Sequence, residues 1–138
     1  LATPIQVINL INIIANKGYF YTPHLIMNKE NVNKIHINFD MSVWEFLNKA
    51  MWNIINTEEG TGRNANINDF DTHIRGKTGT AQNPHGEDHS WFTGYIEVND
   101  DPILSLAVLV ENGGKGSIEA TMISGKIFEY AKKHGLFQ

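Results

Sequence analysis

The stretch Arg75–Gln82, RGKTGTAQ, contains the residues of this chain whose types and spacing best suit chemistry. It can be divided in two ways: Gly-Lys-Thr could end a phosphate-binding loop, and Lys-Thr-Gly could line an acyl-transfer site. A phosphate-binding loop needs a glycine five residues before Gly76, but Asp71 stands there, and its carboxylate would repel a phosphate. Such a loop also leads into a helix, whereas a strand-like segment follows here. We therefore reject the phosphate-binding interpretation.

The acyl-transfer interpretation places Lys77-Thr78-Gly79-Thr80 along one strand. Because side chains alternate between the two faces of a strand, Thr78 and Thr80 share one face and Lys77 lies on the other. Gly79 has no Cβ, so another group can approach the strand closely at that position. A match of three letters is weak by itself, so its value depends on the elements around it.

Metal-capable side chains gather in His85-Gly-Glu-Asp-His89, with His73 upstream. The pattern matches neither H-E-x-x-H nor its inverse. Pro84 and Gly86 also disfavour a continuous helix that would align the two imidazoles. The sequence predicts a polar, solvated loop beside a cleft, with no bound metal and no cofactor.

The three tryptophans could in principle stack on sugars. Trp44 and Trp52 fall within a predicted helix, where packing against neighbouring elements explains them better. Trp91 opens a predicted strand next to the Lys-Thr-Gly strand. It is the tryptophan that we expect to line a groove.

The composition fits a single folded domain. The chain has 138 residues, with 41% hydrophobic and 19% charged residues, which suits a globular protein rather than a disordered one. A formal net charge of −4 argues against nucleic-acid binding, because phosphate backbones require clustered Lys and Arg. The absence of cysteine excludes disulfides and thiolate chemistry. No apolar run approaches the length of about 18–20 residues that a membrane span needs.

Three helices are predicted around this strand. The first runs over 4–17, with a capping box of Thr3 and Gln6 and with Gly18 as its stop. Its nearly continuous apolar surface predicts a buried helix. The second runs from a Ser42 capping box to residue 56, with an apolar face of Val43, Phe46, Leu47, Ala50, Met51, Ile54 and Ile55. The third runs from a Ser117 cap to residue 134.

Alternation of period two predicts three strands over 72–82, 90–98 and 103–111, with a tight turn over 99–102 between the last two. Residues 19–26 are expected to be extended or irregular and 57–69 to form a loop, while 28–40 give no clear signal. The expected fold class is α+β, with three antiparallel strands, a buried N-terminal helix, a second helix and a C-terminal helix.

These elements and motifs together resemble a known family. The segment TPIQVINLINIIANKG is similar to the T-P-x-Q…A-N-x-G helix of class B penicillin-binding proteins. Lys-Thr-Gly is the third signature of penicillin-binding proteins and serine β-lactamases, after S-x-x-K and S-x-N. GKTGTAQ, DHSWFTGY and LSLAVLVENGGKG are similar to consecutive segments of the elongation-type branch, penicillin-binding protein 2. The resemblance covers residues 1–23 and 70–131.

The resemblance implies a role for each residue of the motif. Members of the family cleave the terminal D-Ala-D-Ala of a peptidoglycan stem peptide through a serine acyl-enzyme, and β-lactams acylate the same serine. Thr78 and Thr80 would bind the carboxylate of the substrate or drug, and the backbone N–H of Thr80 would supply half of the oxyanion hole. Lys77 would reach the S-x-N serine, Gly79 would admit the acyl group, and Trp91 would line the substrate groove.

The nucleophile of that family is missing from this chain. None of the five serines is followed by lysine three positions later or by asparagine or aspartate two positions later: Ser42, Ser90, Ser105, Ser117 and Ser124. We therefore expect residues 1–138 to be one partial domain, the C-terminal part of a transpeptidase domain, silent by itself. Unpaired sheet edges and exposed apolar surface should then cause some self-association.

Two alternatives remain open. One is a D,D-carboxypeptidase or β-lactamase of the same superfamily. The other is a non-catalytic interaction or scaffold module of the cell-wall elongation complex. The resemblance further implies binding of stem peptides and β-lactams together with the missing part, no nucleic acid, and a parent in a membrane elongation complex. That parent is expected at the outer face of the cytoplasmic membrane, held by an N-terminal span absent from this chain.

Overall fold

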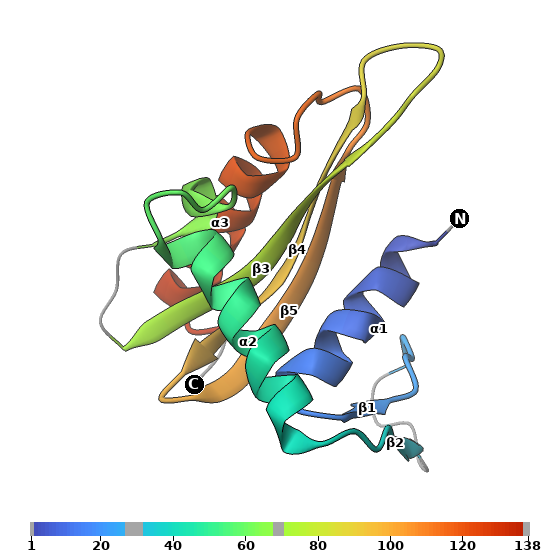
Figure 1. The fold of residues 1–138 in the computed structure, drawn as a ribbon, viewed down its shortest axis with the longest axis vertical. Helices are drawn as coiled ribbons and strands as arrows, with labels where there is room; N and C mark the ends of the chain where they lie inside the picture. Colours follow the sequence, from blue (N-terminus) through green and yellow to red (C-terminus); the bar gives the residue numbers. More distant parts are fainter. Residues whose placement is uncertain (1, 27–31, 68–70, 137–138) are drawn as a thin grey trace.

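A computed structural model describes residues 2–26, 32–67 and 71–136, and all structural statements below concern these residues. The elements follow one another in the chain as α1 (Pro4–Ala15), β1 (Tyr19–Tyr21), β2 (Lys34–His36), α2 (Met41–Asn56), the short 3-10 helix η1 (Arg63–Ala65), β3 (Thr72–Ala81), β4 (His89–Val98), β5 (Asp101–Val110) and α3 (Glu119–Lys133). Strands β3, β4 and β5 form one sheet. It is long and twisted, with helices on both sides (Figure 1).

The sheet is antiparallel with the order β3-β4-β5, so β3 and β5 form its two edges. The β4–β5 turn is tighter than predicted. Asn99 and Asp100 both have positive φ, 51° and 67°, as a two-residue type I′ turn requires. Pro102 therefore lies inside β5, opposite Glu97, rather than in the turn.

The two faces of the sheet carry separate cores. On one face α3 and η1 pack on a cluster of Ile55, Ala65, Ile74, Phe92, Ile96, Leu106, Ala120 and Phe128. On the other, α1 and α2 enclose a cluster of Ile11, Ile13, Ile14, Ala15, Trp44, Met51 and Tyr95. The α+β fold class is confirmed, and the sheet is sandwiched between helical layers.

Helix α2 crosses the edge of the sheet beside β3 (Figure 1). Its Trp44 belongs to the cluster on the α1 side, whereas its Ile55 belongs to the cluster on the α3 side. At the crossing, Asn56 Nδ2 donates to the backbone oxygen of Ile74 at 3.1 Å. The helix thus covers the first half of the β3 edge and leaves Lys77–Ala81 uncovered by the described elements.

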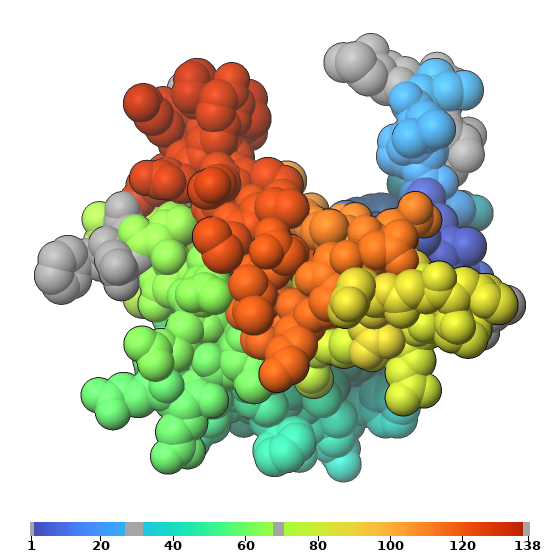
Figure 2. All heavy atoms as spheres, turned by 90° about the horizontal axis from the view of Figure 1, so that it is seen from above, coloured from blue at the N-terminus to red at the C-terminus, as the bar shows by residue number. Residues whose placement is uncertain are grey.

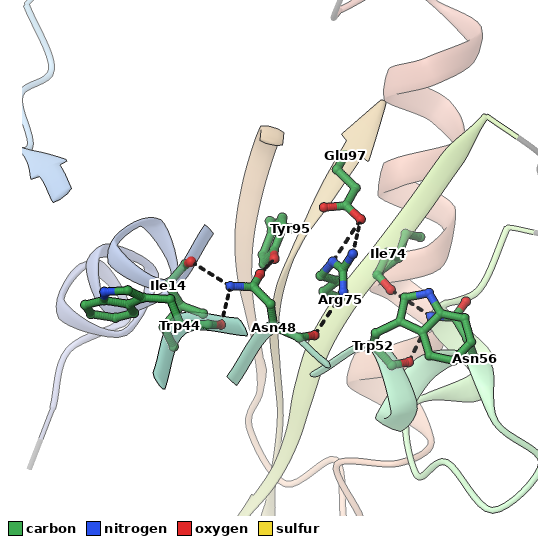
Figure 3. Close-up of polar contacts among 9 residues, drawn as sticks. All are labelled: Ile14, Trp44, Asn48, Trp52, Asn56, Ile74, Arg75, Tyr95 and Glu97. Atoms are coloured by element: carbon green, nitrogen blue, oxygen red, sulfur yellow. Dashed lines mark hydrogen bonds and ion pairs between the residues drawn. The ribbon is translucent and has the colours of Figure 1, made fainter. Parts of the chain in front are cut away.

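A buried polar cluster fixes this crossing (Figure 3). Asn48 Nδ2 donates to the backbone oxygens of Ile14, at 3.1 Å, and Trp44, at 2.8 Å, while its Oδ1 accepts from the Tyr95 hydroxyl. Arg75 donates to the backbone oxygen of Asn48 at 3.0 Å and pairs with Glu97 at 2.5 Å. One cluster therefore ties α1 and α2 to β3 and β4.

Charge and burial change the acid–base behaviour of this cluster in two ways. Burial raises the pKa of Tyr95 far above its ordinary value of 10.0, a change that the nearby Arg75 opposes. Burial lowers the pKa of Arg75, but its hydrogen bond and charge pairing with Glu97 outweigh that effect and raise the pKa overall. The cluster is therefore made of a neutral tyrosine and a firmly charged arginine.

The predicted capping box of α1 is confirmed, because Thr3 and Gln6 exchange both capping bonds. The helix ends earlier than predicted, in a Schellman motif with Lys17 in the left-handed region at φ 53°. Gly18 follows Lys17, and its N–H donates to the backbone oxygen of Ile13, which completes the motif. Only the second half of the helix is buried; Ile5 and Leu10 are 52% and 56% exposed, because no described element lies over them.

Two other predicted helix starts were wrong. Helix α2 begins one residue before Ser42, with Asp40 at the N-cap and no side-chain cap bond. Helix α3 begins two residues after Ser117, with Ile118 at the N-cap. At the start of α3, the Ala120 N–H donates at 3.1 Å to Ser90 Oγ on β4, so a residue distant in the sequence takes the place of the predicted Ser117 cap. The predicted stop of α3 is confirmed by Gly135, whose φ is 61°.

The buried face of α2 also differs from the predicted one. Val43 and Phe46 are 40% and 72% exposed, whereas Trp44 and the polar Asn48 are buried. The helix is rotated because Asn48 meets the polar partners described above. Burial of Trp44 confirms the packing interpretation of that residue.

Residues 19–26 begin with β1, which pairs with β2 in a small separate sheet that the sequence did not indicate. The segments 28–40, which gave no clear signal, and 57–69, predicted as a loop, lie partly outside the described residues. Among the described residues, no helix is long and apolar enough to span a bilayer.

Candidate functional site

The site is built on the second half of β3, at the open edge of the sheet. The backbone oxygen of Ile74 accepts from α2, and that of Thr78 accepts from Lys77 Nζ at 2.6 Å, so both carbonyls face this edge. In an antiparallel strand the N–H and C=O of one residue point the same way, and the direction alternates along the chain. The N–H of Thr80 therefore also faces the open edge.

Side chains alternate as the sequence predicted. Thr78 pairs in register with Phe92, whose side chain is buried beneath α3, so both threonine hydroxyls lie on the α3 side. Gly79 pairs with Trp91 on the opposite face, and a Cβ at Gly79 would lie 3.3 Å from the Trp91 Cβ. Trp91 thus adjoins the motif, but on the face away from the threonine hydroxyls.

The Lys77 side chain is exposed and starts on the face opposite the hydroxyls. Its bond to the Thr78 oxygen brings the ammonium group round to the open edge. Because an ammonium group is a compact point charge on a flexible stem, it adds positive potential beside the two threonines. Lys77 lies in the middle of β3 and not in a loop before a helix, which agrees with rejection of the phosphate-binding interpretation.

The segment after β5 packs against the same half of β3. Gly116 N donates to Thr80 Oγ1 at 3.2 Å. The approach is so close that a Cβ at Gly116 would lie 1.9 Å from the backbone oxygen of Gly79, so glycine is required there. Sequence reasoning read this stretch as part of a family signature and missed its contact with Thr80.

The loop after α2 supplies a third hydroxyl. Thr61 Oγ1 lies 2.8 Å from Thr78 Oγ1. Thr61 stands between Gly60 and Gly62, at the rim of a polar hollow of about 740 Å³ that Arg63, Asn64 and Ser117 also line. Sequence reasoning treated this segment only as a loop; the one available signal was a threonine between two glycines.

The hydroxyls leave donors available for a ligand. A threonine hydroxyl has one proton and two acceptor positions. Thr80 uses its oxygen to accept from Gly116, and Thr61 and Thr78 share one proton between them. Among the described residues two hydroxyl protons and the Thr80 N–H therefore remain at the edge, beside the Lys77 charge. Such a surface suits a carboxylate and a nearby oxyanion.

The polar loop between β3 and β4 is tied to the segment after β5 (Figure 2). Asn83 Nδ2 donates to Asn112 Oδ1 at 2.8 Å, and Asn112 N donates to His89 Nδ1 at 3.0 Å. Gly114 N donates to the backbone oxygen of Asp88 at 2.8 Å. Within the described ranges no three His, Cys, Asp or Glu side chains gather as metal ligands would. His89 and Asp88 serve as hydrogen-bond acceptors in this arrangement.

Comparison with known proteins adds an independent finding. The family described as penicillin binding protein transpeptidase domain matches residues 1–129. The chain is 32% identical to the peptidoglycan D,D-transpeptidase MrdA of Haemophilus influenzae and 27% identical to that of Escherichia coli K12, over 94% and 88% of its length. It spans 23% of the length of each relative.

Solved structures share its fold. A Helicobacter pylori penicillin-binding protein, PBP2, solved in complex with MreC, is 25% identical with a TM-score of 0.79, covering 99% of this chain and 26% of its own. The D,D-transpeptidase domain of a peptidoglycan glycosyltransferase from Eggerthella lenta, at 23% identity, superposes with a TM-score of 0.78 over 99% of this chain and 33% of its own. These matches include residues 27–69, for which the sequence motifs gave no correspondence.

Proposed function

The chain belongs to the penicillin-binding protein transpeptidase family, and on that premise we propose that it is the C-terminal part of the catalytic domain of a peptidoglycan D,D-transpeptidase. The observation that supports this best is the open edge of β3, where Thr78, Thr80 and Lys77 present two hydroxyls, a backbone N–H and a positive charge. In this proposal residues 1–138 bind the substrate, and a serine outside this segment attacks it.

The reaction proceeds through an acyl-enzyme. The serine oxygen forms a bond to the carbonyl carbon of the penultimate D-Ala and gives up its proton to a base. The resulting oxyanion accepts from the N–H of Thr80 and from the N–H of the serine itself. The C–N bond then breaks, and the terminal D-Ala leaves as a protonated amine. An amine of a neighbouring stem peptide attacks the ester, forms the crosslink and releases the serine.

Each residue of the motif has one task in this scheme. Thr78 and Thr80 donate to the carboxylate of the terminal D-Ala, or to the carboxylate of a β-lactam. Lys77 adds positive charge and reaches the second signature serine. Gly79 leaves room for the acyl group, and Trp91 flanks the substrate on the other face of the strand.

The position of the protein in the cell forms part of the same proposal. The Helicobacter pylori relative was solved with MreC. We infer that the protein containing residues 1–138 works in a membrane-bound elongation complex at the outer face of the cytoplasmic membrane. Stem peptides and β-lactams are its ligands there.

A labelling gel with a fluorescent penicillin tests the catalytic proposal. Residues 1–138 are compared with the longer protein that carries the S-x-x-K and S-x-N segments. We expect covalent label on the longer protein only. Treatment of that protein with unlabelled penicillin before the fluorescent penicillin is added should prevent the labelling. Label on residues 1–138 would mean that one of the five serines is a nucleophile and that the proposed mechanism is wrong.

Two observations separate this proposal from its alternatives. A transpeptidase forms dimeric product from a donor plus an acceptor stem peptide, whereas a carboxypeptidase or β-lactamase only hydrolyses its substrate. A reading frame without upstream S-x-x-K and S-x-N segments would instead support a scaffold module.

A further inference from the structure

We propose that Thr61 is a positioning residue for the substrate carboxylate: its hydroxyl donates to that of Thr78, which frees the Thr78 proton for the ligand. This inference rests on the proposed function, because it concerns the same carboxylate site. Thr61 belongs to the loop after α2, far from the Lys-Thr-Gly motif in the sequence.

The direction of this hydrogen bond follows from counting protons. The two Oγ1 atoms are 2.8 Å apart, and either hydroxyl can donate when no ligand is bound. A carboxylate is an acceptor only, so Thr78 must give its single proton to it. The contact between the threonines then persists only if Thr61 donates. Thr61 thereby fixes the rotation of the Thr78 hydroxyl so that its proton points to the ligand.

The backbone around Thr61 is held firmly enough to do this. Gly60 N donates to the backbone oxygen of Thr57, the C-cap residue of α2, at 3.1 Å, and Gly62 N donates to the backbone oxygen of Ile54 in the last turn of α2 at 2.9 Å. A Cβ at Gly60 would lie 2.3 Å from the Ile54 oxygen, and one at Gly62 would lie 2.6 Å from Ile55 Cδ1. The glycines press the loop against α2, and Thr61 between them is exposed and turned to β3.

The second threonine of the motif, Thr80, also has a hydrogen-bond partner from another segment. Thr80 Oγ1 accepts from Gly116 N with one of its two acceptor positions, so this bond leaves the Thr80 hydroxyl proton available to a ligand. Asn64 Nδ2 donates to the backbone oxygen of Ser117 at 3.1 Å and so joins the loop of Thr61 to the segment of Gly116. Two available hydroxyl protons match the two oxygens of a carboxylate. The structure thus assigns carboxylate recognition to three segments, β3, the loop of Thr61 and the segment of Gly116, rather than to one strand.

The test uses the longer protein that contains the serine segments and two probes, benzylpenicillin and its methyl ester. The ester has the same reactive ring but no carboxylate. We expect Thr61→Val to lower the second-order acylation rate with benzylpenicillin about 3- to 10-fold, the range for loss of one hydrogen bond. The rate with the ester should change less than about 2-fold, and Thr61→Ser should retain the wild-type rate for both probes.

Thr57→Val is the matched control, since the Thr57 hydroxyl donates to the backbone oxygen of Asn53 on α2 at 2.7 Å rather than to the motif on β3. It should leave the ratio of the two rates unchanged. In a Thr78→Val background, Thr61→Val should have no further effect, because its action passes through Thr78. An unchanged benzylpenicillin rate in Thr61→Val, or an equal loss with both probes, would overturn the inference.

Failure of the proposed function gives a different result. In that case the wild-type protein reacts with neither probe, and no comparison between variants is needed to see it. A reactive wild-type protein whose Thr61→Val variant behaves like the wild type rejects the positioning role alone.

Discussion

At the scale of single residues, the polar cluster around Asn48 fixes how α2 lies against the edge of β3. Asn48 is 8% exposed, yet its amide contacts two backbone oxygens and the Tyr95 hydroxyl. A buried amide that is fully paired permits one arrangement of the elements that it joins. The rotation of α2, and with it the uncovered length of the β3 edge, follows from this residue.

Tyr95→Phe should lower the free energy of unfolding by about 1 to 3 kcal/mol, because it leaves the buried Asn48 Oδ1 without its donor. Equilibrium unfolding in urea measures this loss. Tyr130→Phe is the control, since Tyr130 is 59% exposed, and it should change stability by less than about 0.5 kcal/mol. Equal stability of the two variants would contradict the role given to the cluster.

Alkaline pH should destabilise the protein through the same tyrosine. The pKa of Tyr95 is raised above its ordinary 10.0 in the folded state, chiefly by burial. Below about pH 10 the side chain keeps its proton in both the folded and unfolded states, so its contribution is constant. Above that pH only the unfolded state releases the proton, so the free energy of unfolding falls as the pH rises, by about 1 kcal/mol near pH 10.5. Urea midpoints at several pH values should therefore fall more steeply in the wild type than in Tyr95→Phe.

At the scale of elements, the segment after β5 is as much a part of the site as β3 itself. It reaches β3 only because Gly116 has no side chain. Gly116→Ala should lower the free energy of unfolding by about 1–3 kcal/mol, because its Cβ would lie 1.9 Å from the backbone oxygen of Gly79, which cannot move aside. Lys115→Ala in the same segment is the control, since Lys115 has an exposed side chain. Urea unfolding measures both, and a stable Gly116→Ala variant would mean that the segment is not held as described.

The β4–β5 turn gives a prediction of the opposite sign. Asp100 has φ 67°, a conformation that glycine adopts more readily, and Asn-Gly is favoured in type I′ turns. Asp100→Gly should therefore raise the free energy of unfolding by about 0.5 kcal/mol. Asp100→Asn removes the same charge but keeps a side chain, so it separates the backbone effect from the electrostatic one. Thermal or urea unfolding of the two variants distinguishes them.

At the scale of the whole molecule, β5 and α1 expose surface that the described residues do not cover. Strand β4 is buried along most of its length, whereas in β5 only Leu106 is buried. Leu10 on the neighbouring α1 is 56% exposed. The chain spans 23% of the length of the two MrdA relatives compared above. We propose that residues 1–138 form a partial domain whose sheet edge and helix face are completed by other segments.

Residues 1–138 alone should therefore self-associate and bind a hydrophobic dye. Light scattering over a range of concentrations measures the association. Leu10→Lys should reduce it, because it places a charge within the exposed apolar surface beside β5. Ile127→Lys on α3 introduces the same charge elsewhere, on a side chain that is 42% exposed, and should have less effect. A monodisperse monomer without dye binding would contradict the partial-domain proposal.

The sequence alone determined the features that depend on local chemistry. Period-two alternation predicted β3, β4 and β5 to within a few residues, because the pleat itself sets that period. The Thr3 capping box and the Gly135 stop were predicted because they involve residues close together in the chain. The Lys-Thr-Gly motif and its resemblance gave the family before any fold was known.

Only the tertiary structure decided which distant segments meet at the motif. Thr61 and Gly116 reach the motif through loops that have no periodic pattern, so no local signal marks them. The buried Asn48 faces inward although its type predicts an exposed position, because it finds partners on α1 and β4. The physical reason is the same in each case: hydrogen bonds and close packing between segments far apart in sequence depend on the path of the chain in space, which residue patterns within one segment do not encode.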